Sequence, residues 1–180
     1  KVISECNVKY IKWDHNRTLV DAGANGRAAY RKQVAAIYSL FSELKKLNPG
    51  LEIESCASGG GRIDLGIADY VDRFWVSDNN DALSRQFIQR WTAQFLPPEL
   101  LGSHIAPSPS HQTGRELSLS FRASTALFGH SGIEWDISRI SSDELVHLAK
   151  WIEYYKSKRN LIHSGKLVRI DFPDTSHHLY

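Results

Sequence analysis

The sequence predicts an α/β protein with a parallel sheet, more specifically part of a (β/α)8 TIM barrel. Five strand-like stretches are each followed by a helical segment. Their starts lie about 20 to 45 residues apart, as expected for parallel strands joined by right-handed crossovers. Polar side chains gather at the carboxyl ends of these strands, where barrels place their active sites. Five units cannot close an eight-stranded barrel, so we expect strands 4 to 8. A doubly wound sheet is the structural alternative, because it binds ligands at the same edge.

The expected strands are short apolar runs rich in β-branched and aromatic residues. They cover residues 8–13, 51–55, 73–77, 101–106 and 132–137. The expected helices have apolar residues spaced three and four apart. They cover residues 27–47, a short segment ending near residue 70, 82–95, 117–128, and 141 to about 162.

Several boundaries have specific signals. Residues 1–7 resemble the end of a helix, and a loop through Gly23 and Gly26 follows the first strand. Asn48-Pro49-Gly50 ends the long helix that we expect over 27–47. Ser141 and Glu144 have the spacing of a capping box at the start of the last helix.

The last residues differ in pattern from the rest. Residues 166–172 alternate like a strand of another, β-type unit. We therefore expect residues 1–165 to form the carboxyl-terminal portion of the barrel. Residues 166–180 are expected to be a linker and the first strand of a truncated β-sandwich.

Composition excludes several classes of partner. The 180 residues include 22 basic and 20 acidic ones, a net charge of +2, which gives no nucleic-acid footprint. No apolar stretch approaches the roughly 20 residues that cross a bilayer, so no membrane association is expected. The histidines lack metal-ligand spacing, and we expect neither metal nor cofactor. The two cysteines, Cys6 and Cys56, suggest free thiols, which favours a cytoplasmic location.

The first strand ends in residues of unusual chemistry. Because side chains alternate along a strand, Lys12 and Asp14 share one face and Trp13 points to the other. A carboxylate at the end of a buried strand is costly unless it is compensated. An ion pair that closes the strand end is one explanation, and a catalytic carboxylate is the other.

A second acid, Asp78, follows the third expected strand and faces the same edge as Asp14. Glycosidases use such pairs of carboxyl groups, one as general acid and one as nucleophile or base. The ammonium group of Lys12 favours ionised Asp14, which suits a nucleophile, whereas the apolar residues 74–76 before Asp78 suit a general acid. Taken alone, Asp78 could also be an ordinary turn residue.

Three motifs in order settle between these readings. Tyr-Ile-Lys-Trp-Asp-His-Asn-Arg (10–17), Glu-Ser-Cys-Ala-Ser-Gly-Gly-Gly-Arg (54–62) and Trp-Val-Ser-Asp-Asn-Asn-Asp-Ala (75–82) strongly resemble retaining α-galactosidases of glycoside hydrolase family 36. Phe-Gly-His-Ser-Gly-Ile-Glu-Trp-Asp (128–136) fits a later part of the same domain. The resemblance covers essentially the whole chain. It implies an α-galactoside oligosaccharide of the melibiose or raffinose type as the substrate.

The resemblance also implies residue roles. Asp14 is expected to be the catalytic nucleophile and Asp78 the acid/base of a double displacement. Lys12, Cys56 and Gly59 match family positions that touch galactose, with Lys12 hydrogen-bonding ring hydroxyls.

Further candidate substrate-binding residues surround these positions in the sequence: Trp13, Asn16, Ser58, Gly60, Arg62, Trp75 and His104. Glycines let backbone N–H groups approach a sugar closely, and Asn16 could instead cap its loop. Arg62 could hold an acid or cap the short helix. His104 and Trp135 could line the pocket or fill the barrel interior, and Asp136 could support the site indirectly.

The enzymes of this family carry an N-terminal β-domain, the first barrel strands and a C-terminal β-sandwich. We therefore expect this chain alone to be weakly active or inactive, unless copies associate as a homo-oligomer through unpaired strand edges. The chemical alternatives are a raffinose-synthase-like galactosyltransferase and an α-N-acetylgalactosaminidase. Two other classes are a phosphate cradle at residues 58–61 before a helix and a non-catalytic assembly module.

Overall fold

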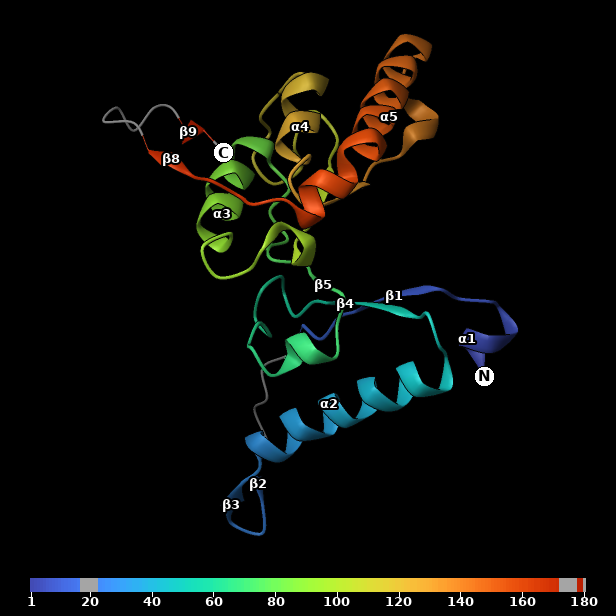
Figure 1. Cartoon of the computed structure of the whole chain (residues 1–180), viewed down its shortest axis with the longest axis vertical. Helices are drawn as coiled ribbons and strands as arrows, with labels where there is room; N and C mark the ends of the chain where they lie inside the picture. Colours follow the sequence, from blue (N-terminus) through green and yellow to red (C-terminus); the bar gives the residue numbers. More distant parts are fainter. Residues whose placement is uncertain (17–22, 172–177, 180) are drawn as a thin grey trace. The chain divides into compact units, whose positions relative to one another are not determined.

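The computed structural model describes residues 1–16, 23–171 and 178–179 (Figure 1). The chain divides into two compact units, residues 1–78 and 79–180. Within the described residues, no helix has both the length and the apolar character that a bilayer crossing requires.

The first unit contains a three-stranded parallel sheet in the order β1-β4-β5. Its elements are α1 (Val2–Glu5), β1 (Tyr10–Trp13), β2 (Gly23–Ala24), β3 (Arg27–Ala28), α2 (Tyr30–Leu47), β4 (Glu52–Ser55), the 3-10 helix η1 (Ile67–Asp69) and β5 (Arg73–Phe74). In the sheet, Lys12 of β1 lies opposite Glu54 of β4, which lies opposite Arg73 of β5. Because all three strands are parallel, the loops that follow them leave from one edge.

Helix α2 packs along the sheet of this unit (Figure 1). The ring of Phe41 on α2 is fully buried and meets the ring of Trp13 edge-on, with their centroids 5.4 Å apart. Ile53 and Phe74, from the other two strands, are also fully buried. Apolar burial between one helix face and one sheet face therefore holds the strands that carry the candidate site.

The second unit contains the parallel pair β6–β7 and the helices around it. Its elements are α3 (Ala82–Thr92), the 3-10 helix η2 (Pro98–Leu100), β6 (Gly102–Ile105), α4 (Leu119–Thr125), β7 (His130–Ile133), the 3-10 helix η3 (Ile137–Arg139), α5 (Ser142–Ser164), β8 (Ile170–Asp171) and β9 (His178–Leu179). Its core includes Ile105, Ala123, Ala126 and Leu148, against which Trp151 packs.

Arg122 of α4 ties this second core together. Its guanidinium donates to the carbonyl oxygen of Ala106 at 2.6 Å, pairs with Glu144 of α5 at 2.9 Å and lies 4.6 Å from the centre of the Trp135 ring. Ser141 caps α5 as expected, with its hydroxyl accepting from the N–H of Glu144 at 3.1 Å. The Glu144 carboxylate pairs with Arg122, so it joins α4 to α5.

The prediction of an α/β fold with parallel strands is confirmed, but several boundaries were wrong. The helix predicted over 27–47 begins only at Tyr30, because Arg27 and Ala28 pair with Gly23 and Ala24 in a hairpin. The short helix ending near residue 70 is a single 3-10 turn. The strand predicted over 132–137 is β7, and Ile137 instead begins η3, which Asp136 caps.

The remaining elements are shorter than predicted. Helices α3 and α4 end before residues 95 and 128, and β5 has only two residues where a strand over 73–77 was expected. Of the strand predicted over 166–172, Ile170 and Asp171 form β8, which pairs with β9 in an antiparallel manner. Residue 172 lies outside the described residues. The domain boundary after residue 165 remains a prediction.

Candidate active site

Asp14 directly follows β1 and is held by a loop neighbour. The side-chain amide of Asn16 donates to Asp14 Oδ2 at 2.9 Å, and its carbonyl oxygen accepts from the N–H of Ser58 at 2.8 Å. Asn16 therefore links the loop after β1 to the glycine-rich loop after β4. This contact brings together two motifs that are more than 40 residues apart in sequence.

The electrostatic surroundings of Asp14 favour its ionised form. Burial raises the pKa of this carboxyl group, but hydrogen bonds from Cys56, Asn16 and the His15 backbone, together with the positive charge of Lys12, lower it by more. The net pKa lies below the usual value. Asp14 is therefore an anion at neutral pH, as a nucleophile must be.

Cys56 has the opposite character. Its side chain is 1% exposed, and burial, with the nearby Asp14 carboxylate, raises the pKa of the thiol to about 11. The thiol therefore stays protonated at neutral pH and can donate to Asp14. Such a thiol is a poor nucleophile, so Cys56 is not a candidate for the catalytic nucleophile.

The glycine-rich loop packs directly on the chain that leads to Asp78. Gly59 has a φ of +78°, and a Cβ at this position would lie 2.7 Å from Ser77 Cα. A Cβ at Gly60 would lie 3.0 Å from the carbonyl oxygen of Val76. The small residues here therefore allow a close contact between the β4 and β5 loops. Residues after this loop form only the 3-10 turn η1, which leaves the phosphate-cradle hypothesis without the helix it needs.

Trp75 connects Lys12 to Asp78. The Lys12 ammonium nitrogen lies 4.3 Å from the centre of the Trp75 ring, and the indole N–H donates to Asp78 Oδ1 at 3.0 Å. The Trp75 ring is 1% exposed. In this unit the indole supports the two polar residues and presents almost no surface of its own.

Other predicted site residues have different surroundings. Trp13 packs on Phe41 of α2, so its ring contributes to the core of the first unit. Arg62 donates to the carbonyl oxygen of Cys56 at 3.4 Å. His104 belongs to the second unit, where its Nδ1 lies 2.8 Å from Glu134 Oε2. Trp135 lies under Arg122, and Asp136 pairs with Arg139 at 2.9 Å.

Sequence reasoning missed two buried acids. Glu54 on β4 is 1% exposed and lies 3.9 Å from the Lys12 ammonium nitrogen. Asp81 is fully buried, caps α3 by accepting from the N–H of Ser84 at 2.9 Å, and forms an ion pair with Arg115. A charged residue inside an apolar strand was the available signal for Glu54, and an acid just before a helix was the signal for Asp81.

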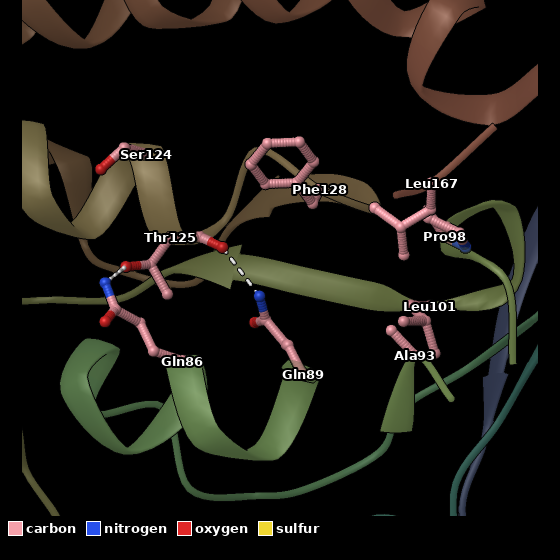
Figure 2. A pocket seen from close by; sticks show the side chains of 9 residues that line it. All are labelled: Gln86, Gln89, Ala93, Pro98, Leu101, Ser124, Thr125, Phe128 and Leu167. Atoms are coloured by element: carbon pink, nitrogen blue, oxygen red, sulfur yellow. Dashed lines mark hydrogen bonds between the residues drawn. The ribbon is translucent and has the colours of Figure 1, made fainter. Parts of the chain in front are cut away.

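The second unit also has a cavity of about 210 Å³ between α3, α4 and the start of β6 (Figure 2). Gln89 donates to the Thr125 carbonyl oxygen at 2.8 Å, and Gln86 donates to the Thr125 hydroxyl at 3.3 Å. No predicted site residue lines this cavity. In the described part of the chain, no group of three or more His, Cys, Asp or Glu side chains is placed to hold a metal ion.

Acids and a glycine-rich loop at the carboxyl ends of parallel strands are the kind of site that β/α enzymes use. The family model described as Melibiase matches residues 1–165. The chain therefore belongs to the Melibiase family.

Named relatives agree with this family. The alpha-galactosidase of Escherichia coli is 47% identical over 97% of this chain. The crystal structure of an alpha-galactosidase from Lactobacillus brevis is 37% identical, covers 96% of this chain and superposes with a TM-score of 0.87. A variant of AgaA from Geobacillus stearothermophilus in complex with raffinose is 33% identical, covers 92% and has a TM-score of 0.85. This chain spans about a quarter of each relative: 25%, 24% and 24% of their respective lengths.

The Gly59 contact gives a first prediction. Gly59→Ala is expected to lower the free energy of unfolding by about 1 to 3 kcal/mol more than Gly50→Ala. Both glycines have positive φ, but a Cβ at Gly50 meets nothing within 4 Å, whereas one at Gly59 overlaps Ser77. Urea unfolding of the two variants measures the difference. Equal losses would show that the loop does not press on the β5 segment.

The buried acid Asp81 gives a prediction about pH. Burial raises the pKa of Asp81. Hydrogen bonds from Ser84 and Thr113 and the charge of Arg115 lower it by a larger amount, so the net pKa lies below its ordinary value. A carboxyl group with a lowered folded-state pKa stabilises the fold above its unfolded pKa and loses that effect as pH falls. Asp81→Asn should therefore cost about 1 to 3 kcal/mol near pH 7 and progressively less below about pH 4.

Unfolding by urea at several pH values tests this expectation. Glu153→Gln, at an exposed position in the middle of α5, is the matched control and should leave the pH profile parallel to wild type. A loss for Asp81→Asn that is constant from pH 3 to pH 7 would contradict the assignment.

Proposed function

We propose that this chain is the carboxyl-terminal portion of the (β/α)8 catalytic domain of a retaining α-galactosidase. Strands β1, β4, β5, β6 and β7 would be barrel strands 4 to 8, and residues 166–180 would lead into a C-terminal β-sandwich. The observation that most strongly supports this proposal is the position of the two acids. Asp14 and Asp78 follow β1 and β5, two strands of one parallel sheet with only β4 between them. The names of the relatives support the same activity.

In the proposed reaction, Asp14 attacks the anomeric carbon of a terminal α-galactoside while Asp78 protonates the departing oxygen. Asp78 then takes a proton from water, which attacks the galactosyl–Asp14 ester and releases galactose with retained configuration. The lowered pKa of Asp14 supports its assignment as the nucleophile. The indole of Trp75, bonded to Asp78 Oδ1, orients that carboxyl group.

The substrate-binding residues are proposed to be Lys12, Asn16, Cys56, Ser58, Gly59, Gly60, Arg62 and His104, with Trp13 and Trp75 supporting them. Lys12 would donate to ring hydroxyls, and the backbone of the glycine-rich loop would approach the sugar closely. The substrate would be an oligosaccharide such as raffinose, which the AgaA complex contains. Two free cysteines, one of them exposed, favour a cytoplasmic location.

An active site needs the rest of the barrel, and β1 pairs only with β4 in the described sheet. We propose that the free edge of β1 pairs with further barrel strands or, for this chain alone, with a second copy. Gel filtration with light scattering tests the second case. A concentration-dependent dimer is expected, and a monomer at every concentration would contradict self-association.

The assignment of the nucleophile is tested in a chimera, with this chain replacing the matching segment of the E. coli alpha-galactosidase. Asp14→Ala should lower the turnover of a nitrophenyl α-galactoside at least about 1000-fold, because the covalent intermediate cannot form. Added azide should restore turnover and give β-galactosyl azide. Product analysis with raffinose separates hydrolysis from galactosyl transfer.

Asp69→Asn is the matched control, because Asp69 is exposed on η1 and takes no part in the proposed reaction. It should retain wild-type turnover in the same chimera. Unchanged turnover in Asp14→Ala would remove Asp14 from the mechanism.

A further inference from the structure

Glu54 is a buried carboxylate at the centre of the first unit. It lies on β4, the middle strand of the sheet, with 1% of its side chain exposed. Its Oε1 has no hydrogen-bond partner within the described residues. Burying a carboxylate whose acceptor atom lacks a hydrogen bond is unfavourable for folding. This residue therefore calls for an explanation beyond packing.

The cation that faces Glu54 is Lys12. The two residues lie opposite each other in the parallel register of β1 and β4, so their side chains leave the same face of the sheet. The Lys12 ammonium nitrogen lies 3.9 Å from Glu54 Oε1, and its side chain remains 34% exposed. Lys12 therefore reaches from the buried acid toward solvent.

The other groups near Glu54 are engaged differently. Arg73 lies opposite Glu54 on β5, but its guanidinium pairs with Glu52 and lies 5.1 Å from the centre of the Tyr10 ring. Burial and the charge of Glu54, which accepts a hydrogen bond from the Tyr10 hydroxyl, raise the pKa of Tyr10. Lys12 is therefore the cation within ion-pair distance of Glu54 in the described structure.

Trp75 restricts Lys12 from a second direction. Its ring lies 4.3 Å from the ammonium nitrogen, within the range of a cation–π contact. A lysine side chain has four rotatable bonds and loses considerable entropy when it is fixed. An acid at its side and an aromatic ring beneath it define one position for the ammonium group before any ligand arrives.

We propose that Glu54 is a positioning residue that, together with Trp75, holds the Lys12 ammonium group ready to donate to galactose hydroxyls. The inference rests on the proposed function for the identity of the sugar. The placement of Lys12 by Glu54 can be tested separately from sugar binding. Glu54 itself is buried and acts on the substrate only through Lys12.

The first test observes Lys12 without any ligand. In the chain labelled with ¹³C-lysine, the terminal methylene signal of Lys12, assigned with Lys12→Arg, should be shifted upfield by the Trp75 ring. Glu54→Gln should return the signal to the range of exposed lysines. Glu54→Asp, which keeps the charge but shortens the side chain, should give an intermediate position.

Asp69→Asn is the control, because Asp69 is an acid of the same unit that is exposed on η1. Its Lys12 signal should match wild type. Amide spectra of each variant establish that the fold is retained, and Glu54→Asp provides the test if Glu54→Gln does not fold. A Lys12 signal that is unchanged in folded Glu54→Gln or Glu54→Asp would overturn the proposal.

The second test measures binding of D-galactose, the product of the proposed reaction, to the same variants in the chimera by titration. Glu54→Gln and Lys12→Gln should each weaken binding about 10- to 100-fold, the value of one hydrogen bond from a charged group. The double variant should bind no more weakly than Lys12→Gln, because Glu54 acts through Lys12. Additive losses would overturn the proposal.

The two tests separate the two ideas. If the Lys12 signal responds as expected but the wild-type chain and the chimera bind no galactoside, the proposed function fails and the placement of Lys12 by Glu54 stands. If galactosides bind but the Lys12 signal does not respond to substitution of Glu54, the placement of Lys12 by Glu54 fails and the proposed function stands.

Discussion

The parallel register of β1, β4 and β5 is the constraint on which the candidate site depends. It places Lys12 opposite Glu54 and Glu54 opposite Arg73, and it sends the three following loops from one edge of the sheet. A slip of one residue in β1 would turn Lys12 to the other face. The packing of Trp13 on Phe41 opposes such a slip, because it fixes which face of β1 meets α2.

The charged and polar side chains near the ends of β1 and β4 have complementary roles. Lys12 lies near two acids, the buried Glu54 and the exposed Asp14, and it favours the ionised form of Asp14. Cys56 contributes a protonated thiol, which can donate to Asp14 without competing with it as a nucleophile. The positive charge of Lys12 therefore compensates the buried Glu54 and also stabilises the ionised form of Asp14. This explains why a lysine lies two residues before the aspartate.

Much of the fold followed from local patterns in the sequence. The five parallel strands were predicted from short apolar runs, and the main helices from apolar residues spaced three and four apart. The hairpin before α2 was missed, although Asn25-Gly26 is a good signal for a two-residue turn and both residues have positive φ. Arg27 and Ala28 also suit a helix, and the predicted helix over 27–47 followed from this local preference. The pairing with Gly23 and Ala24 overrides it.

The candidate site was only partly accessible from sequence. The acids after β1 and β5 could be recognised because strand ends carry function in parallel sheets. The role of Asn16 as a link between two loops depends on the distance between segments far apart in the chain. The burial of Glu54 depends on three strands at once. The position of Trp13, in contrast, could be predicted from sequence, since the alternation of faces along the strand already separated it from Lys12 and Asp14.

Covalent trapping of the nucleophile is the most direct test of the central claim. A fluorinated galactosyl fluoride, which forms a slowly hydrolysed glycosyl-enzyme, would be added to the chimera with the E. coli enzyme. Peptide mapping by mass spectrometry would then locate the attached sugar. The account predicts a single label on Asp14, and a label on any other residue would contradict it.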